Sequence, residues 1–229
     1  MEANTIQINN LTKIYQEGEN QVIALNNINL TISKGEFTAI VGPSGSGKTT
    51  LLNMIGVLDK PSGGKIIVDE INIADLSSND LINFRRDNVG FVFQSFNLIP
   101  VLSAKENVSL VMDIQGVPTE KSNKRAIELL ENVGLGNRIN SRPNKLSGGQ
   151  QQRVAVARAL ASKPKFILAD EPTANLDSKS AETLLDIMEK LNREENITFI
   201  FSTHDPRIMN KARRIIRLED GKIIEDKTK

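Results

Sequence analysis

The residues best suited to chemistry form one short run, Gly42-Pro43-Ser44-Gly45-Ser46-Gly47-Lys48-Thr49. An apolar strand-like run, 37–41, precedes it, and a helix-like run, 49–55, follows it. Glycines let such a loop curl so that its backbone N–H groups face one centre, and the following helix adds the positive end of its dipole. The pattern predicts a phosphate-binding loop, in which Lys48 reaches the phosphates and the Thr49 hydroxyl binds Mg²⁺.

Two further polar groups follow this loop in the sequence. The run Leu146-Ser147-Gly148-Gly149-Gln150 opens a helix-like stretch, 151–160. Ser147 can cap that helix, and the two glycines again let backbone amides face an anion. Asp170 and Glu171 end an apolar run that begins at Phe166. An apolar strand that ends in two carboxylates resembles a Walker B motif, which holds Mg²⁺.

Strand and helix patterns surround these motifs. Residues 5–41 read as short strands, because apolar residues alternate clearly at Ile28, Leu30 and Ile32 and less regularly before them. After the middle of the chain, strands and helices alternate at 165–170, 178–194, 197–202, 205–211, 213–218 and 222–225. This rhythm is typical of a mainly parallel sheet covered by helices, and thus of an α/β fold.

Residues 95–163 have a different pattern, in which strand patterns stop and helical ones dominate. Pro118 and Glu120 begin a helix there, and glycines at 134 and 136 end it. We interpret this stretch as a helical subdomain inserted into the sheet domain. The chain is then a single domain, 1–229, with a core of residues 1–94 and 164–229 and a helical subdomain of residues 95–163.

Composition excludes several classes of protein. The 29 Lys and Arg nearly balance the 28 Asp and Glu, so the formal net charge is +1, and we expect no nucleic-acid partner. The chain lacks cysteine, so disulfides and thiolate metal sites are impossible. No apolar run approaches the roughly 18 residues that a membrane helix needs, and the N-terminus lacks the pattern of a signal peptide. We therefore expect a cytoplasmic protein that reaches a membrane only through a partner.

The motifs, taken in this order, identify a resemblance. The chain is similar over nearly its whole length to the ATPase subunit of ABC transporters. The resemblance implies the ABC type of P-loop NTPase fold, with an antiparallel β part at the N-terminus. It also implies ATP and Mg²⁺ as cofactors. The loop residues that would contact the nucleotide are Gly42, Pro43, Ser44, Gly45, Ser46, Gly47, Lys48, Thr49 and Thr50.

The same resemblance implies roles for single residues. Asp170 would hold Mg²⁺ together with Thr49, and Glu171 would be the general base for the attacking water. His204, the only histidine of the chain, would contact the γ-phosphate. Gln94 matches the Q-loop glutamine, which senses Mg²⁺ and the attacking water. Lys48, Gln94, Glu171 and His204 form the expected catalytic set.

The only tyrosine, Tyr15, stands where the family places an aromatic residue that stacks on adenine. A stack of this kind is worth about 1–3 kcal/mol. It is tolerant of the base, so GTP stays possible as a nucleotide.

The resemblance also implies a homodimer in which each ATP lies between two subunits. One subunit would supply the phosphate-binding loop, and the other would supply Ser147, Gly148, Gly149 and Gln150. The run Ala174-Asn175-Leu176-Asp177 resembles the D-loop, which crosses to the second subunit. ATP binding and hydrolysis would then close and open a symmetric dimer and drive an integral membrane transporter subunit.

Three segments narrow the branch of the family. Residues 58–64, 91–100 and 203–206 look like those of lipoprotein-releasing and macrolide-exporting ATPases, the LolD and MacB types. A non-transport relative of the cell-division type and a low-turnover regulatory module remain alternatives. We expect the segment 96–102 to dock the membrane subunit through an exposed apolar cluster of Phe96, Leu98, Ile99, Val101 and Leu102.

Overall fold

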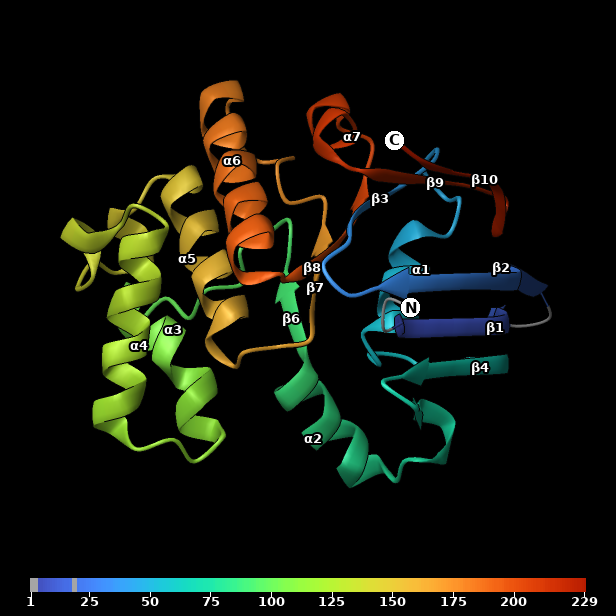
Figure 1. Ribbon diagram of the computed structural model, residues 1–229, viewed down its shortest axis with the longest axis horizontal. Helices are drawn as coiled ribbons and strands as arrows, with labels where there is room; N and C mark the ends of the chain where they lie inside the picture. Colours follow the sequence, from blue (N-terminus) through green and yellow to red (C-terminus); the bar gives the residue numbers. More distant parts are fainter. Residues whose placement is uncertain (1–3, 18–19) are drawn as a thin grey trace.

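The computed structural model describes residues 4–17 and 20–229, whose strands form two sheets (Figure 1). The antiparallel sheet has the order β2-β1-β4-β5 and is built from β1 (Asn4–Glu17), β2 (Asn20–Ser33), β4 (Gly63–Val68) and β5 (Ile71–Asn72). The second sheet has the order β10-β9-β3-β8-β7-β6 and is built from β3 (Phe37–Val41), β6 (Val89–Val92), β7 (Phe166–Asp170), β8 (Thr198–Thr203), β9 (Arg214–Glu219) and β10 (Lys222–Thr228). Its strands are parallel except for β10, which pairs antiparallel with β9.

Seven α-helices occur in the described residues: α1 (Lys48–Ile55), α2 (Ser78–Asn88), α3 (Ala104–Ile114), α4 (Thr119–Asn132), α5 (Gly148–Ala161), α6 (Ser178–Glu195) and α7 (Pro206–Lys211). In Figure 1, α3 and α4 lie at one end of the molecule and the antiparallel sheet lies at the other, with the parallel strands between them. Within residues 4–17 and 20–229, no helix combines the length and the apolar character needed to span a membrane.

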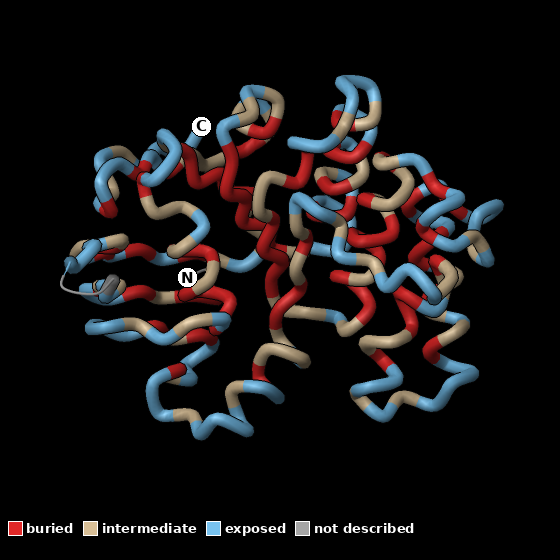
Figure 2. The backbone as a smooth tube through the Cα atoms, turned by 180° about the vertical axis from the view of Figure 1, so that it is seen from behind, coloured by how far each residue is buried: buried red, intermediate tan, exposed pale blue. Residues whose placement is uncertain are grey.

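The parallel strands are buried on both faces, as the red centre of Figure 2 shows. Phe37, Ala39 and Val41 of β3 belong to a core cluster with buried residues of α3, α4, α5 and α6. Ile40 points the other way, into a second cluster with the antiparallel sheet and α1. Side chains alternate between the faces of a strand, so the apolar residues of Phe37–Val41 fill both cores. Thr38, the one polar residue of the strand, is buried, and its hydroxyl donates to Glu36 at 2.6 Å.

This topology gathers the sequence motifs at one edge of the sheet. β3, β8, β7 and β6 are parallel neighbours, and each has a motif residue at its carboxyl end or within two residues of it. Residues 42–47 follow β3, Asp170 ends β7, His204 follows β8, and Gln94 lies two residues beyond β6. The carboxyl ends of parallel strands form the usual binding edge of an open α/β sheet.

The predicted fold class is confirmed: the chain is α/β, with a mainly parallel sheet, an antiparallel β part and flanking helices. The division into a core and a helical subdomain at residues 95 and 163 stays a prediction.

Some element lengths differ from the sequence prediction. β1 and β2 are 14 residues long each rather than short. Their pairing contains register shifts, one of them between Ile8 and Leu11, so the inward-facing positions change phase. These bulges explain the irregular apolar pattern at the N-terminus. The last strand also runs further than predicted, to Thr228 rather than 225.

Candidate active site

The loop at 42–47 connects β3 to α1. Gly47, the N-cap of α1, has a left-handed backbone with a φ of 101°, and a Cβ there would lie 2.5 Å from the Ala24 carbonyl oxygen. A Cβ on Gly42 would lie 2.0 Å from the Leu218 carbonyl oxygen. Both positions therefore require glycine, because a side chain would collide with backbone atoms.

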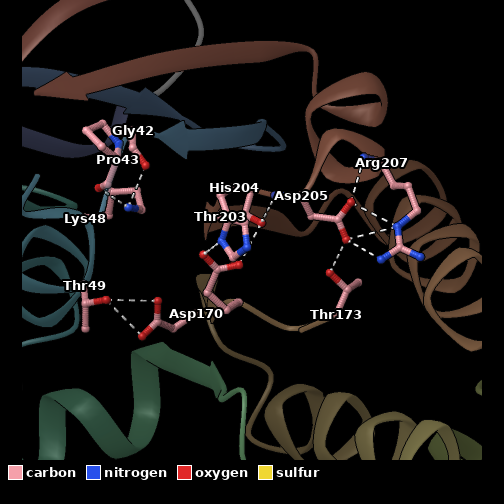
Figure 3. A network of polar contacts seen from close by, with 11 residues as sticks. Gly42, Pro43, Lys48, Thr49, Asp170, Thr173, Thr203, His204, Asp205 and Arg207 are labelled. Carbon is pink, nitrogen blue, oxygen red and sulfur yellow. Dashed lines mark hydrogen bonds and ion pairs between the residues drawn. The ribbon is translucent and has the colours of Figure 1, made fainter. Parts of the chain in front are cut away.

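Lys48 folds over this loop (Figure 3). Its ammonium group donates hydrogen bonds to the carbonyl oxygens of Gly42, at 2.9 Å, and Pro43, at 2.8 Å. Lys48 is also the first residue of α1, whose N-terminal N–H groups carry partial positive charge. A cation beside a helix N-terminus makes a site that favours an anion such as phosphate.

Thr49 and Asp170 meet across the edge of the sheet. The Thr49 hydroxyl lies 3.3 Å from each carboxylate oxygen of Asp170, although the two residues come from α1 and β7 (Figure 3). A hydroxyl and a carboxylate are hard oxygen ligands of the kind that Mg²⁺ prefers. Gln94 is exposed, and its carbonyl accepts a hydrogen bond from the Asn175 side chain at 3.0 Å.

Glu171 and His204 form the second close pair of the site. Glu171 Oε1 lies 2.6 Å from His204 Nδ1, and Glu171 Oε2 accepts a hydrogen bond from the Thr203 hydroxyl at 3.1 Å. The Glu171 side chain is 17% exposed, whereas that of His204 is 76% exposed. The backbone of Glu171 is left-handed, with a φ of 44°. Such a conformation is strained for a residue other than glycine and is common at functional sites.

A cavity of about 640 Å³ joins these groups. Its lining contains Glu171, His204 and every loop residue from Gly42 to Thr50 except Ser46, which is buried. Gln94 and Asp170 are not among the described residues that line it. The cavity thus brings a cation, a helix N-terminus and a carboxylate–imidazole pair around one space, an arrangement suited to binding a phosphate and activating a water beside it.

Tyr15 lies at the hairpin beside this cavity. It stands opposite Val22 in the β1–β2 pairing, and Val22 lines the cavity. The Tyr15 hydroxyl donates to Asp59 at 3.0 Å, and the Lys13 ammonium lies 4.7 Å from the ring centroid. Burial and the Asp59 carboxylate raise the pKa of Tyr15, so the phenol stays protonated.

The run 146–150 begins α5 at a different place. The backbone N–H of Gln150 donates to the Ser147 hydroxyl at 3.3 Å, and the backbone N–H of Ser147 donates to Gln150 Oε1 at 3.0 Å. These two hydrogen bonds form a capping box. Asp177 caps α6 through the Ser180 amide at 2.9 Å. Neither 146–150 nor Asp177 belongs to the described lining of the cavity. Their predicted contact with nucleotide in a second subunit stays a prediction.

A comparison with protein families agrees with this geometry. Residues 25–174 match the family model described as "ABC transporter", which is more than half of the chain. The chain belongs to the ABC transporter family. The match extends from β2 through the phosphate-binding loop and α5 to the D-loop-like run, so the described cavity lies largely within it.

Two relatives of this ABC protein differ in how much of their own length the match covers. It is 50% identical over 222 residues to the uncharacterized ABC transporter ATP-binding protein MJ0796 of Methanocaldococcus jannaschii, covering 95% of this chain and 94% of that protein. It is 49% identical over 212 residues to the macrolide export ATP-binding/permease protein MacB of Campylobacter jejuni, covering 93% of this chain but only 33% of that protein.

A solved structure gives the same result for the ABC fold. This structure is a dimeric post-hydrolysis state of the ATP-binding cassette MJ0796 bound to ADP and Pi. The sequence of that protein is 48% identical to this chain. The TM-score is 0.89, and the alignment covers 97% of this chain and 98% of that one. The protein is therefore an ABC ATPase, as the sequence predicted.

The site of this ABC ATPase contains residues that sequence reasoning missed. Val22, Ile23 and Ala24 of β2 line the cavity. Val22 and Ile23 are 49% and 55% exposed, so an apolar pair at a predicted hairpin is the signal that could have revealed them. Thr173 was missed as well, because its hydrogen bond of 2.6 Å joins it to Asp205, 32 residues away.

Asp205 sits beside the Glu171–His204 pair in this ABC ATPase. Its side chain is 11% exposed, and it accepts hydrogen bonds from Thr173 and Arg207 (Figure 3). Burial raises the pKa of this carboxyl, but the hydrogen bonds from Arg207 and Thr173 outweigh burial and hold the pKa at about 2. Asp205 therefore stays ionised and can act as a fixed anchor between β7 and α7.

Proposed function

We propose that this ABC ATPase binds ATP in the described cavity and uses Glu171 as the general base for its hydrolysis. The observation that carries this proposal is the Glu171–His204 contact of 2.6 Å in the same cavity as the phosphate-binding loop. Lys48 holds the β- and γ-phosphates, since it supplies a cation at the helix N-terminus. Glu171 takes a proton from the attacking water, and His204 contacts the γ-phosphate.

Thr49 and Asp170 hold Mg²⁺ in this proposal. Their oxygens lie 3.3 Å apart and have the hard character that the ion requires. The ion neutralises charge on the phosphates when it is bound. Thr49 and Asp170 would hold the ion, and it would supply positive charge beside the phosphates. Gln94, in the loop after β6, would sense the ion and the attacking water.

We also propose that two copies of the chain enclose each ATP. The phosphate-binding loop comes from one copy, and Ser147, Gly148, Gly149, Gln150 and Asp177 come from the other. Two observations support this proposal. These residues do not line the cavity of their own chain, and the solved structure of MJ0796 is described as dimeric. The Tyr15 ring, fixed by Asp59 and Lys13, stacks on the base.

The proposed partner is an integral membrane transporter subunit, which holds the ATPase at the inner face of the cell membrane. The MacB relatives support this proposal, because their name joins an ATP-binding part to a permease. Their name favours macrolide export over a cell-division role. Peptide export and lipoprotein release belong to the same proposal through the sequence resemblance alone.

The Lys48→Ala variant tests the binding site. We expect the loss of the ammonium group to abolish ATP binding or turnover, measured with a fluorescent ATP analogue and by phosphate release. Lys65→Ala, which removes an exposed lysine of β4, is the matched control and keeps both. Unchanged affinity together with unchanged turnover in Lys48→Ala would refute the proposed phosphate contact.

A further inference from the structure

A buried glutamine connects the helix that follows residues 146–150 to the two catalytic loops. Gln152 lies in the first half of α5 and has no exposed surface. Its Nε2 donates to the Pro172 carbonyl at 2.8 Å and to the Phe93 carbonyl at 3.1 Å. Both partners are acceptors, so the amide must point its NH₂ group toward them. Within the described part of the chain, Gln152 Oε1 has no hydrogen-bond partner.

The two carbonyls belong to the residues next to the catalytic ones. Pro172 follows Glu171, and Phe93 precedes Gln94. One side-chain amide therefore fixes the backbone beside the general base and beside the Q-loop glutamine. A second connection, the Asn175 side chain to the Gln94 carbonyl at 3.0 Å, runs between the same two loops.

The backbone of Glu171 needs such support. Its φ of 44° is strained for glutamate, and strained residues persist only where neighbouring contacts fix them. The Glu171 amide donates to the Ser202 carbonyl at 2.9 Å, which fixes the chain before the carboxylate. The Gln152 hydrogen bond to Pro172 fixes the chain directly after it.

We propose that Gln152 is a positioning residue for ATP hydrolysis, which sets Glu171 and Gln94 in one geometry relative to α5. This inference rests on the roles proposed above for those two residues. Gln152 does not line the cavity, and its hydrogen bonds go to Phe93 and Pro172 instead of the phosphate-binding loop. It therefore acts on the hydrolytic step and not on nucleotide binding. Because α5 begins at the run 146–150, this amide couples a movement of that run to both catalytic loops.

The Gln152→Met and Gln152→Glu variants test the proposal. Methionine keeps the length of the side chain without donors. Glutamate keeps its shape, but because burial keeps its carboxyl protonated it offers one O–H donor in place of the two N–H donors that serve both carbonyls. We expect kcat, normalised to the stoichiometry of fluorescent ATP binding, to fall about 10- to 100-fold, as misplaced catalytic groups cause. The KM for ATP should change less than about threefold. If Gln152→Met does not fold, the normalised kcat of Gln152→Glu tests the proposal in its place.

Asn192→Leu is the matched control. Asn192 is a buried amide of α6 that donates to the carbonyls of Gly35, at 2.9 Å, and Ile197, at 2.6 Å, away from the cavity. Its removal should lower the melting temperature but leave the normalised kcat near the native value. A normalised kcat in both Gln152 variants as high as in Asn192→Leu would overturn the proposal.

Glu171→Gln in the same assay separates the two claims. If this variant is inactive and the Gln152 variants keep the native kcat, only the positioning role is wrong. If Glu171→Gln itself turns over at the native rate, the proposed base is wrong, and the reason for a kcat effect at Gln152 is removed with it.

Discussion

Glu171 is held at both of its carboxylate oxygens and at its backbone amide. His204 contacts one oxygen, Thr203 donates to the other, and the amide donates to the Ser202 carbonyl. These contacts leave little freedom in a side chain that is only 17% exposed. A carboxylate fixed in this way needs little reorganisation before it accepts a proton, which is the property of a preorganised catalytic group.

The Glu171→Gln substitution removes the ability to accept a proton while it keeps the size of the side chain. We expect turnover to fall about 10²- to 10⁴-fold, because a positioned base contributes that much. Phosphate release under saturating ATP measures the effect. Glu120→Gln, at an exposed position of α4, serves as the control and should keep the native rate. Native turnover in Glu171→Gln would assign the base to another residue.

At the scale of elements, Asp205 connects α7, β8 and the segment between β7 and α6. It caps the N-terminus of α7 through the Arg207 amide, follows β8 closely, and accepts from Thr173 in the segment between β7 and α6. Because its pKa is held at about 2, below the ordinary 3.8, the folded state favours the ionised form. This stabilisation is complete above about pH 4 and disappears as the pH falls through about 2.

The Asp205→Asn variant tests that connection. At pH 7 it should lower the free energy of unfolding by about 2 kcal/mol, which follows from a pKa difference of nearly two units. The difference from the native protein should shrink between pH 4 and pH 2. Urea unfolding at several pH values measures it. A deficit that stays constant down to pH 2 would show that the lost stability comes from packing and not from the ionised carboxylate.

The segment 96–102 is also held as a unit. Arg158 of α5 donates to the carbonyls of Phe96 and Asn97, both of which have a positive φ. Buried Asn107 of α3 accepts from the Ile99 amide at 2.8 Å and donates to the carbonyls of Ile99 and Leu102. The segment is therefore a fixed loop, which suits the proposed docking of a membrane subunit.

The exposure of the segment decides which substitution tests the docking. Val101 is 70% exposed, whereas Leu98 packs against the buried core, contrary to the predicted exposed cluster. Val101→Glu should keep the melting temperature and basal ATPase activity near native, since exposed substitutions usually change stability by less than about 0.5 kcal/mol. Membrane fractionation should show that it detaches from the membrane. Leu98→Glu is the contrasting variant and should lower the melting temperature.

If Val101→Glu stays with the membrane fraction as the native protein does, Val101 is not part of the docking surface. A fall in the melting temperature of Val101→Glu would instead assign it to packing.

The sequence predicted those elements whose signals are local. The phosphate-binding loop, the buried strands and the alternation after residue 165 follow from short patterns and were found. α3 was not recognised as a separate helix, although Ser103 and Glu106 form a capping box that marks its start. The bulges in the β1–β2 pairing were missed because they depend on the partner strand.

Long-range contacts explain the rest of the misses. Burial of Leu98 depends on the helices that cover it, and spacing alone cannot reveal this. The Glu171–His204 contact joins residues 33 apart in sequence, so only the family resemblance paired them in advance. The Gln152 connection had no sequence signal that could be separated from an ordinary helical glutamine.

At the scale of the whole molecule, one chain carries two glycine-containing runs at separate places. The run 42–47 lines the cavity and the run 146–150 does not. We therefore infer that one nucleotide joins two copies of the chain, each of which contributes one run. A C₂ arrangement of this kind gives two equivalent sites in a closed dimer.

The molar mass of Glu171→Gln in solution, with and without ATP, tests this claim most directly. We expect this variant to bind ATP and to hydrolyse it about 10²- to 10⁴-fold more slowly, so the closed state should accumulate. Light scattering after gel filtration should give one chain, 25.3 kDa, without nucleotide and twice that mass with Mg²⁺ and ATP. The Gly148→Asp substitution, added to Glu171→Gln, should prevent the doubling through charge repulsion with phosphate. A mass of one chain at saturating ATP, with bound nucleotide confirmed, would contradict the claim.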